Sequence, residues 1–318
     1  MESNNQTKLA AYCLELYAEL KKSHVDGPWS PSPVEERGFD LREFFLNKKG
    51  ILDKFRRTFL VAGRQNFPDS PRGEFYIHWG LPGDIPMQLR IQGKIKIFQM
   101  ILKLFFYSKF QLKLSNLKDT MIGKPVPQKI LGYDITESQI RNFYYKEEIK
   151  KNIGEDHNIA VEIGGGFGGL AGELLTKLKI NQYILVELFD AIPLAYYYLR
   201  NLLDDDIKIQ VITEDDSIID NDAKVILMAP NQMSKISSDV TTFINTMSFQ
   251  HMNEDAIKFY LNHADRLNAK NIFLNNRDWV RDPSDLIISQ YPIPKNYKNV
   301  VWKKWLYGDH TLAVYKRT

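Results

Sequence analysis

The stretch VEIGGGFGG, residues 161–169, decides the fold, because an apolar strand runs there into a turn made almost entirely of glycine. Five of the six positions from 164 to 169 are glycine. Glycine adopts positive φ angles without strain and lets the backbone come close to a ligand, although it costs conformational entropy on folding. A tight strand-to-helix turn alone needs one or two glycines, so this density predicts a nucleotide-binding turn.

The glycine spacing leaves two kinds of nucleotide open. Gly164, Gly166 and Gly169 match the G-x-G-x-x-G fingerprint of dinucleotide-binding domains. Glu187 follows about 20 residues later, where a carboxylate accepts hydrogen bonds from the two hydroxyls of a ribose. Glu162 favours S-adenosylmethionine instead, because its carboxylate would attract the charged amino group of a methionine moiety and repel a pyrophosphate.

Apolar runs and helical patterns alternate from residue 158 onward. This alternation predicts a doubly wound, Rossmann-like parallel sheet with helices on both faces and ligands at the carboxyl ends of the strands. The predicted strands are 159–163, 182–187, 208–212, 224–228, 241–245 and 272–274, and the predicted helices are 169–178, 190–202 and 254–267, the last with Asn253 as its cap.

The C-terminal segment has a different pattern. Residues 298–307 and 311–316 flank the turn Gly308-Asp309, which predicts a β-hairpin and hence an antiparallel pair added to the parallel sheet. A doubly wound sheet that ends in such a hairpin is the usual arrangement of class I S-adenosylmethionine-dependent methyltransferases. NAD-binding domains seldom end this way.

The first 122 residues are predicted to form a mainly helical cap or substrate region, and residues 123–318 the S-adenosylmethionine-binding domain. Pro125 and Pro127 mark the connection, since two prolines exclude a regular helix there. Thr136 then opens a helix with a T-x-x-Q capping box. On this helix, Arg141 and Tyr145 are expected to lie beside the nucleotide turn.

Composition and charge exclude several classes of protein. A net charge of +3 with 25% charged residues is far below the basic density of nucleic-acid-binding proteins. A single cysteine, Cys13, excludes an internal disulfide and fits a reducing compartment. The N-terminus lacks the pattern of a signal peptide, so a cytoplasmic location is expected.

Residues 95–112 form the most apolar helical segment. Lysines interrupt it too often for a membrane span, so no integral membrane segment is expected. A buried helix is one interpretation. A surface-lying amphipathic helix that makes peripheral contact with anionic lipid is the other. The sequence does not indicate the oligomeric state.

The chain resembles the sugar O-methyltransferase family over the region from Gly123 to the C-terminus. The resemblance rests on the glycine turn, Glu187, the segment YYYL at 196–199, the segment INTMSFQHM at 244–252 and NNR at 275–277. In that family the third segment looks like N-T-x-S-F-Q-E-M, and His251 takes the place of the glutamate here. The resemblance implies methyl transfer from S-adenosylmethionine to a sugar hydroxyl, in a surface polysaccharide or its nucleotide-sugar precursor.

Transfer to an alcohol needs a base, and His251 is predicted for this role because an imidazole titrates near neutrality. Glu254 is its predicted orienting partner; helix capping or filling of a polar pocket are the alternatives for His251. The predicted cofactor contacts are Glu162, Gly164, Gly165, Gly166, Gly168, Glu187, Leu188, Asn245 and Arg141. The predicted substrate contacts are Tyr145, Ser248, Gln250, Asn275 and Arg277, and no metal site is predicted.

Two other functions remain open from the sequence. The dinucleotide fingerprint also fits an NAD-dependent Rossmann oxidoreductase that acts on a nucleotide sugar. The same fold could also serve as a non-catalytic binding module. Methyl-donor binding and glycan methylation separate these possibilities.

Overall fold

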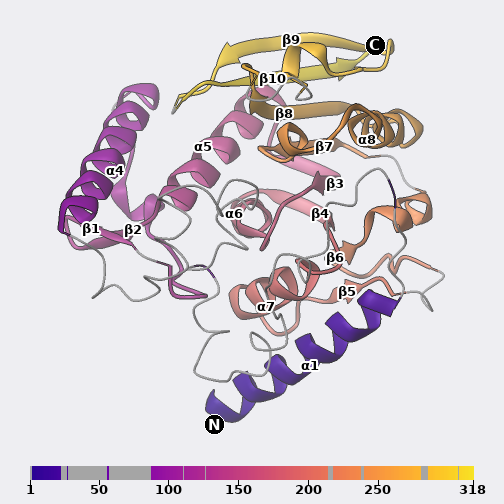
Figure 1. The fold of residues 1–318 in the computed structure, drawn as a ribbon, viewed down its shortest axis with the longest axis horizontal. Coiled ribbons are helices and arrows are strands. Elements are labelled where there is room, and N and C mark those ends of the chain that lie inside the picture. Colours follow the sequence, from indigo (N-terminus) through magenta and orange to yellow (C-terminus); the bar gives the residue numbers. More distant parts are fainter. Residues whose placement is uncertain are drawn as a thin grey trace. The chain divides into compact units, whose positions relative to one another are not determined.

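A computed structural model describes residues 2–22, 27, 56, 87–109, 111–125, 127–213, 218–237, 240–280, 286–306 and 308–318 (Figure 1). The chain divides into two compact units. The first comprises residues 1–41 and 148–318, and the second comprises residues 42–147. The predicted domain division between residues 122 and 123 stays a prediction.

An eight-stranded sheet forms the centre of the first unit, with the strand order β5-β6-β4-β3-β7-β8-β10-β9. Figure 1 shows these strands one below another, from β9 at the top to β5. The strands are β3 (Asp156–Ile163), β4 (Lys179–Val186), β5 (Ile209–Val211), β6 (Val225–Met228), β7 (Thr242–Thr246), β8 (Asn271–Arg277), β9 (Tyr297–Lys304) and β10 (His310–Arg317). The first six are parallel, whereas β10 pairs antiparallel with both β8 and β9. The predicted doubly wound sheet with a C-terminal antiparallel hairpin is therefore confirmed.

The central strands are buried on both faces, as parallel strands between two helical layers must be. In β4 every residue from 182 to 186 is buried. Ile184 and Val186 belong to the hydrophobic core that includes Ile257 and Leu261 of α8 (Glu254–Arg266). The intervening side chains of β4 point to the opposite face, because successive residues of a strand alternate. The sheet consequently needs a cover on each side.

The helices begin where local sequence favours them. α6 (Gly169–Lys177) starts directly after the glycine turn, as predicted, and α7 (Ile192–Leu202) has a proline, Pro193, in its first turn. In α8 the Asn253 side chain accepts a hydrogen bond from the Ala256 amide at 2.8 Å, which confirms the predicted cap. α1 (Glu2–Lys22) packs against α7 and buries Cys13 completely.

Among its described residues, the second unit has two α-helices, one 3₁₀ helix and a small hairpin. These elements are α4 (Met87–Tyr107), the 3₁₀ helix η4 (Leu114–Leu117), the antiparallel strands β1 (Gln128–Ile130) and β2 (Tyr133–Ile135), and α5 (Glu137–Asn152), which continues into the first unit. The Thr136 hydroxyl accepts from the Gln139 amide at 3.2 Å, so the predicted N-cap is confirmed. Arg56 forms a buried ion pair with Asp119 at 2.6 Å. The β1–β2 hairpin was not expected, because three-residue strands carry too little pattern.

Strand register brings the candidate residues to one edge of the sheet. Ile163 at the end of β3 lies opposite Val186 of β4 on one side and Asn245 of β7 on the other. Because these strands are parallel, the segments that follow them leave the sheet at the same edge. The glycine turn, Glu187 and the segment after β7 meet there.

Candidate nucleotide-binding site

The glycine turn has the backbone conformation that only glycine adopts easily. Gly164, Gly166 and Gly168 have φ angles of 71°, 61° and 82°, all in the left-handed region. Side chains with a Cβ rarely adopt this region, because the Cβ clashes with the backbone there. The conformation explains three of the glycines in the motif without reference to a ligand.

Packing explains a fourth glycine, Gly165, and gives a second reason for glycine at position 164. A Cβ at Gly164 would lie 2.5 Å from the Cβ of Ser248, and a Cβ at Gly165 would lie 2.6 Å from the carboxylate of Glu162. Both distances are too short for non-bonded atoms. Gly164 and Gly165 are therefore required by the interior of the protein, whatever binds outside it.

Gly166 has different surroundings. Apart from its two chain neighbours, no atom of the described residues lies within 4 Å of a Cβ built on it, so the space in front of this residue is open. The amide of Gly166 donates to the Glu187 carboxylate at 3.0 Å, and the amide of Leu188 donates to the other oxygen at 2.6 Å. An open backbone turn with a carboxylate beside it fits a nucleoside, whose hydroxyls donate hydrogen bonds to such a carboxylate.

Glu162 lies behind the turn. Its side chain is 1% exposed, and the Tyr183 hydroxyl donates to its Oε2 atom at 2.7 Å. Burial raises the pKa of Glu162 to about 7; the hydrogen bond from Tyr183 lowers it and the charge of Glu187 raises it. The sequence predicts a carboxylate that faces the ligand, whereas the structure places this carboxylate beneath Gly165. Its charge can act on a ligand only across the turn.

Asn245 holds the segment after β7 against the turn. Its side-chain amide donates to the carbonyl of Ile163 at 2.9 Å, and its oxygen accepts from the Phe249 amide at 3.1 Å and from the Asn276 side chain at 2.9 Å. Asn245 is fully buried. In this structure it supports the site from behind, and the predicted direct contact with a cofactor would require it to move.

A polar cluster forms where β7 and β8 end, and its members are Ser248, Gln250, His251, Asn276 and Arg277. Gln250 is 7% exposed, and its side-chain oxygen accepts from the backbone amide of Arg277 at 3.0 Å. The backbone amide of Gln250 donates to the side-chain oxygen of Asn276 at 3.2 Å. The Gln250 side-chain nitrogen lies 3.2 Å from Nε2 of His251. Gln250 thereby ties the half-buried His251, in the 3₁₀ helix η6 (Phe249–His251), to the end of β8.

The other predicted residues of this cluster have varied surroundings. Arg277 is 5% exposed, donates to the carbonyl of Gln250 and lies 5.4 Å from the centre of the Trp279 ring. Asn275 is fully buried, so it too lies behind the surface. Glu254 is exposed in the first turn of α8. Its predicted pairing with His251 stays a prediction.

Arg141 and Tyr145 lie on the part of α5 that belongs to the second unit. Their predicted contacts with the cofactor and the substrate therefore stay predictions. Leu188, directly after Glu187, is half-buried. It follows the end of β4, and its amide and the Gly166 amide donate to the same Glu187 carboxylate, so Leu188 lies at the same edge of the sheet as the glycine turn.

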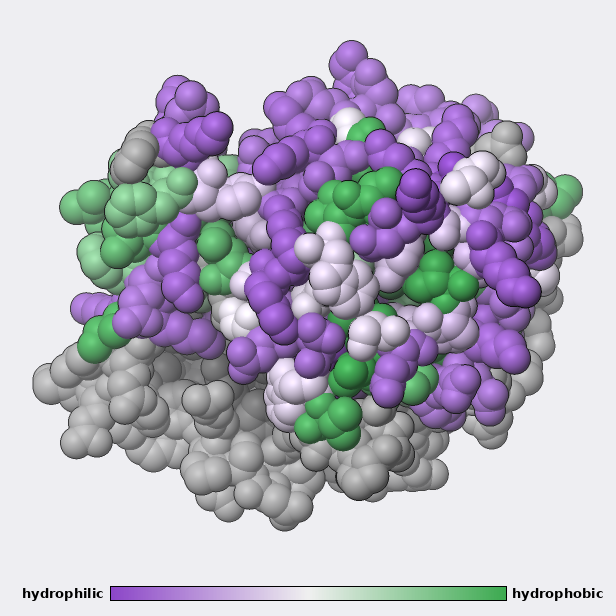
Figure 2. Space-filling model, turned by 90° about the horizontal axis from the view of Figure 1, so that it is seen from above, coloured by the Kyte–Doolittle hydropathy of each residue, from purple (hydrophilic) through white to green (hydrophobic). Residues whose placement is uncertain are grey.

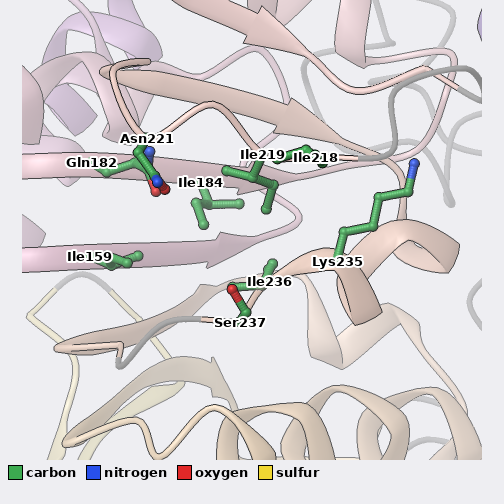
Figure 3. Close-up of a pocket in the computed structure, with 9 residues that line it drawn as sticks. All are labelled: Ile159, Gln182, Ile184, Ile218, Ile219, Asn221, Lys235, Ile236 and Ser237. Carbon is green, nitrogen blue, oxygen red and sulfur yellow. The ribbon is translucent and has the colours of Figure 1, made fainter.

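The structure also contains a cavity of about 290 Å³ away from the turn (Figure 3). It is lined by Ile159, Gln182, Ile184, Ile218, Ile219, Asn221, Lys235, Ile236 and Ser237. Ile159 and Gln182 lie in the first halves of their strands, and residues 218–221 lead into β6. The cavity is thus on a face of the sheet toward the amino ends of the strands, and it includes none of the predicted site residues.

Within the described ranges, no three His, Cys, Asp or Glu side chains come together in a way that could hold a metal ion. None of the described helices combines the length and the apolar character needed to cross a bilayer.

Sequence reasoning missed the role of four residues that shape the site, one of which, Ser248, it had identified for a different role. Tyr183 holds Glu162, Ser248 limits Gly164, Asn276 binds Asn245, and Trp279 lies against Arg277. Ser248 was predicted only as a substrate contact. All but the last of these pairs join different strands or their loops, so spacing along the sequence contains no signal for them.

No protein-family model matches the chain, and no curated protein matches it in sequence. Among solved structures it is similar to an Escherichia coli protein described as a candidate methyltransferase, at 12% identity over 61% of this chain and 90% of that chain, with a TM-score of 0.39. It is also similar to magnesium protoporphyrin IX methyltransferase from Synechocystis PCC 6803 with bound SAH, at 8% identity over 56% and 82%, with a TM-score of 0.40. A third is the methyltransferase domain of bacterial CtHen1-C, at 10% identity over 56% and 96%, with a TM-score of 0.41. At these values the likeness bears on neither the activity nor the substrate of this chain.

Proposed function

We propose that this chain is an S-adenosylmethionine-dependent O-methyltransferase that acts on a sugar hydroxyl. The observation that supports this most is the open space at Gly166 beside the Glu187 carboxylate, at the carboxyl edge of a parallel sheet that ends in an antiparallel hairpin. This edge is where doubly wound sheets bind ligands. The hairpin favours the methyl donor over a dinucleotide.

The chain's own residues would hold the donor in three ways. Glu187 would accept hydrogen bonds from the ribose, after releasing the Gly166 amide that it binds now. The glycine backbone would let the nucleoside approach, since any side chain at Gly166 would enter that space. Leu188 would contribute apolar contact. The bound donor supplies a sulfonium-linked methyl group and a neutral thioether as the leaving group.

The charge at the turn favours a cation. Glu187 stands at the surface of the turn and Glu162 lies beneath it, so two carboxylates approach the same backbone segment. Glu187 attracts a sulfonium nucleoside with a charged amino group and repels the pyrophosphate of NAD, and Glu162, with its pKa of about 7, adds to this effect only in its deprotonated form. This is the physical reason to prefer the methyltransferase.

We assign the base to His251. A sugar hydroxyl must lose its proton as the oxygen–methyl bond forms and the methyl–sulfur bond breaks, and an imidazole is suited to accept it. Gln250 would act as a positioning residue, because it contacts His251 at 3.2 Å and is itself fixed by the end of β8. Glu254 is exposed one turn away and is the next candidate for the base.

The acceptor is proposed from the polar character of the cluster after β7 and β8. Ser248 and Gln250 offer hydroxyl and amide groups to a sugar, and Arg277 beside Trp279 offers a cation and an aromatic face. A surface polysaccharide or its nucleotide-sugar precursor fits these groups. Asn275 would support Arg277 from the same strand.

The glycine spacing also fits an NAD-dependent oxidoreductase that acts on a nucleotide sugar, because Gly164, Gly166 and Gly169 match the dinucleotide fingerprint. The two carboxylates and the terminal hairpin oppose this function. Binding of NAD with hydride transfer to a nucleotide sugar would establish it.

The test is a methyl-transfer assay. Purified full-length protein is incubated with isotopically labelled S-adenosylmethionine and a panel of nucleotide sugars and cell-surface glycans, and label in the sugar fraction is measured. We expect label on a hydroxyl of at least one acceptor. Donor binding without label on any acceptor would instead support a non-catalytic binding module, and transfer to nitrogen or sulfur of an added acceptor would refute the O-methyltransferase assignment.

A further inference from the structure

The helix α4 has two apolar faces. One is buried and contains Ile97, Met100, Ile101 and Leu104, none of them more than 8% exposed. The other contains Ile95, Phe98 and Leu102, which are 52%, 57% and 44% exposed. Their spacing of three and four residues places them on one side of a helix with 3.6 residues per turn. We call Ile95, Phe98 and Leu102 the exposed stripe.

The charge of α4 has a single sign. Its 21 residues include four lysine or arginine residues and no aspartate or glutamate. Lys94 and Lys103 are exposed. At 100° per residue they fall on opposite flanks of the exposed stripe. Figure 2 shows apolar green surface along α4, with hydrophilic purple surface next to it.

We propose that the exposed stripe of α4 docks on an anionic lipid surface. An apolar stripe between lysines is the pattern of a helix that lies in the plane of a membrane interface, with its apolar side chains inserted and its lysines at the headgroups. Soluble proteins rarely leave adjacent large apolar side chains half exposed on one helix face. The proposal does not depend on the methyltransferase function.

The charges favour a lipid surface over a second copy of this chain. In a symmetric pair of α4 helices, the lysines that flank one stripe would approach those of the other, and like charges oppose such a contact. Anionic headgroups attract the same lysines. Lys96 contributes less, because it is paired with Glu137 at 2.6 Å.

The test is sedimentation of the full-length protein with lipid vesicles. Vesicles of phosphatidylcholine alone are compared with vesicles of phosphatidylcholine and phosphatidylglycerol, at low and high salt. We expect binding to the anionic vesicles only, and weaker binding at high salt because the lysine contribution is screened. Equal binding to both vesicle types, or binding to neither, would overturn the proposal.

Two variants locate the binding surface. Phe98→Ser with Leu102→Ser removes apolar groups, and we expect at least a roughly ten-fold loss of vesicle partitioning. Lys94→Gln with Lys103→Gln should lower vesicle partitioning roughly thirty-fold, because each lysine near an anionic surface contributes about 1 kcal/mol. Unchanged partitioning of either variant would overturn the proposal.

Matched controls come from the first unit. Val300→Ser with Trp302→Ser changes side chains of similar exposure, 47% and 45%, on β9, and Lys258→Gln with Lys270→Gln changes exposed lysines. Both controls should bind vesicles as the wild type does. Circular dichroism shows whether each variant is folded. If light scattering shows a wild-type dimer that the stripe variant converts to a monomer, the occupant is a second copy and the lipid proposal is wrong.

Discussion

The glycine turn and the polar cluster after β7 and β8 meet at one edge of the sheet, but different parts of the sequence determine them. The turn is specified by consecutive residues, and its left-handed glycines follow directly from the motif. The cluster is assembled from segments about 26 residues apart, through Gln250, Asn276 and Arg277. The comparison shows that local pattern identifies where a ligand binds, whereas tertiary packing decides which side chains reach it.

The largest effect is expected in the polar cluster. His251→Ala should lower turnover by about 10² to 10⁴ because the base is lost, while donor affinity stays unchanged. Steady-state kinetics with an identified acceptor measure it. His263→Ala is the matched control, since His263 lies on α8 beside Arg266 and Phe259, away from η6. Retained turnover in His251→Ala would move the role of base to another group, with Glu254 as the first to test.

The next effect is expected in the turn. Gly164→Ala should lower the free energy of unfolding by about 2 to 5 kcal/mol, from a left-handed φ and from overlap with Ser248. Urea denaturation measures it. The double variant with Ser248→Gly should recover the part due to overlap and leave the part due to φ. If the second substitution recovers nothing, the contact between turn and cluster does not limit this position.

Much of the fold follows from the sequence. The strands β3, β4, β6 and β7, the caps Thr136 and Asn253 and the C-terminal hairpin all have local signals, namely apolar runs, side chains that cap helices and a glycine turn. Strand ends were less predictable. β3 begins at Asp156 and not at Ile159, because backbone pairing with β4 extends through polar residues that apolar pattern does not detect.

The site could be predicted only in part. Glu187 and the glycines were found because their spacing is fixed by the strand–turn–helix unit. The burial of Glu162, Asn245 and Asn275 was not found, since a polar residue at a strand end gives no local sign of whether it faces a ligand or the interior. Tyr183, which holds Glu162, is 21 residues away on another strand. Only the register of the sheet brings these two together.

The buried Glu162 gives a prediction that depends on pH. The pKa of Glu162 is raised from 4.5 to about 7 in the folded protein, so the folded state keeps a proton that the unfolded state loses. Stability therefore falls as the pH rises from about 4.5 to about 7, by about 3 kcal/mol in all. Glu162→Gln removes this cost. The free energy of unfolding of the variant minus that of the wild type should therefore be larger above pH about 7 than below pH about 4.5.

Urea denaturation at a series of pH values tests this. A stability difference between Glu162→Gln and wild type that does not change with pH would contradict the account. Tyr183→Phe is the control, because the hydrogen bond from Tyr183 lowers the pKa of Glu162. Its loss should raise the pKa of Glu162 in the folded protein further, so that the decrease in stability still begins near pH 4.5 but extends to higher pH.

The smallest effect on stability is expected at Gly166. Gly166→Ala should cost only about 1 to 2 kcal/mol, because its Cβ meets open space and only the left-handed φ opposes it. The urea midpoint of Gly166→Ala should therefore lie closer to wild type than that of Gly164→Ala. Equal losses at the two positions would mean that the space at Gly166 is not open.

Calorimetric titration of the wild type and of Gly166→Val with S-adenosylmethionine, and of the wild type with NAD, tests most directly whether the turn holds a sulfonium nucleoside. We predict heat of binding for the wild type with S-adenosylmethionine, none with NAD, and none for folded Gly166→Val, because its branched side chain occupies the open space. Binding of NAD in place of S-adenosylmethionine, or undiminished binding of the donor by Gly166→Val, would contradict the account.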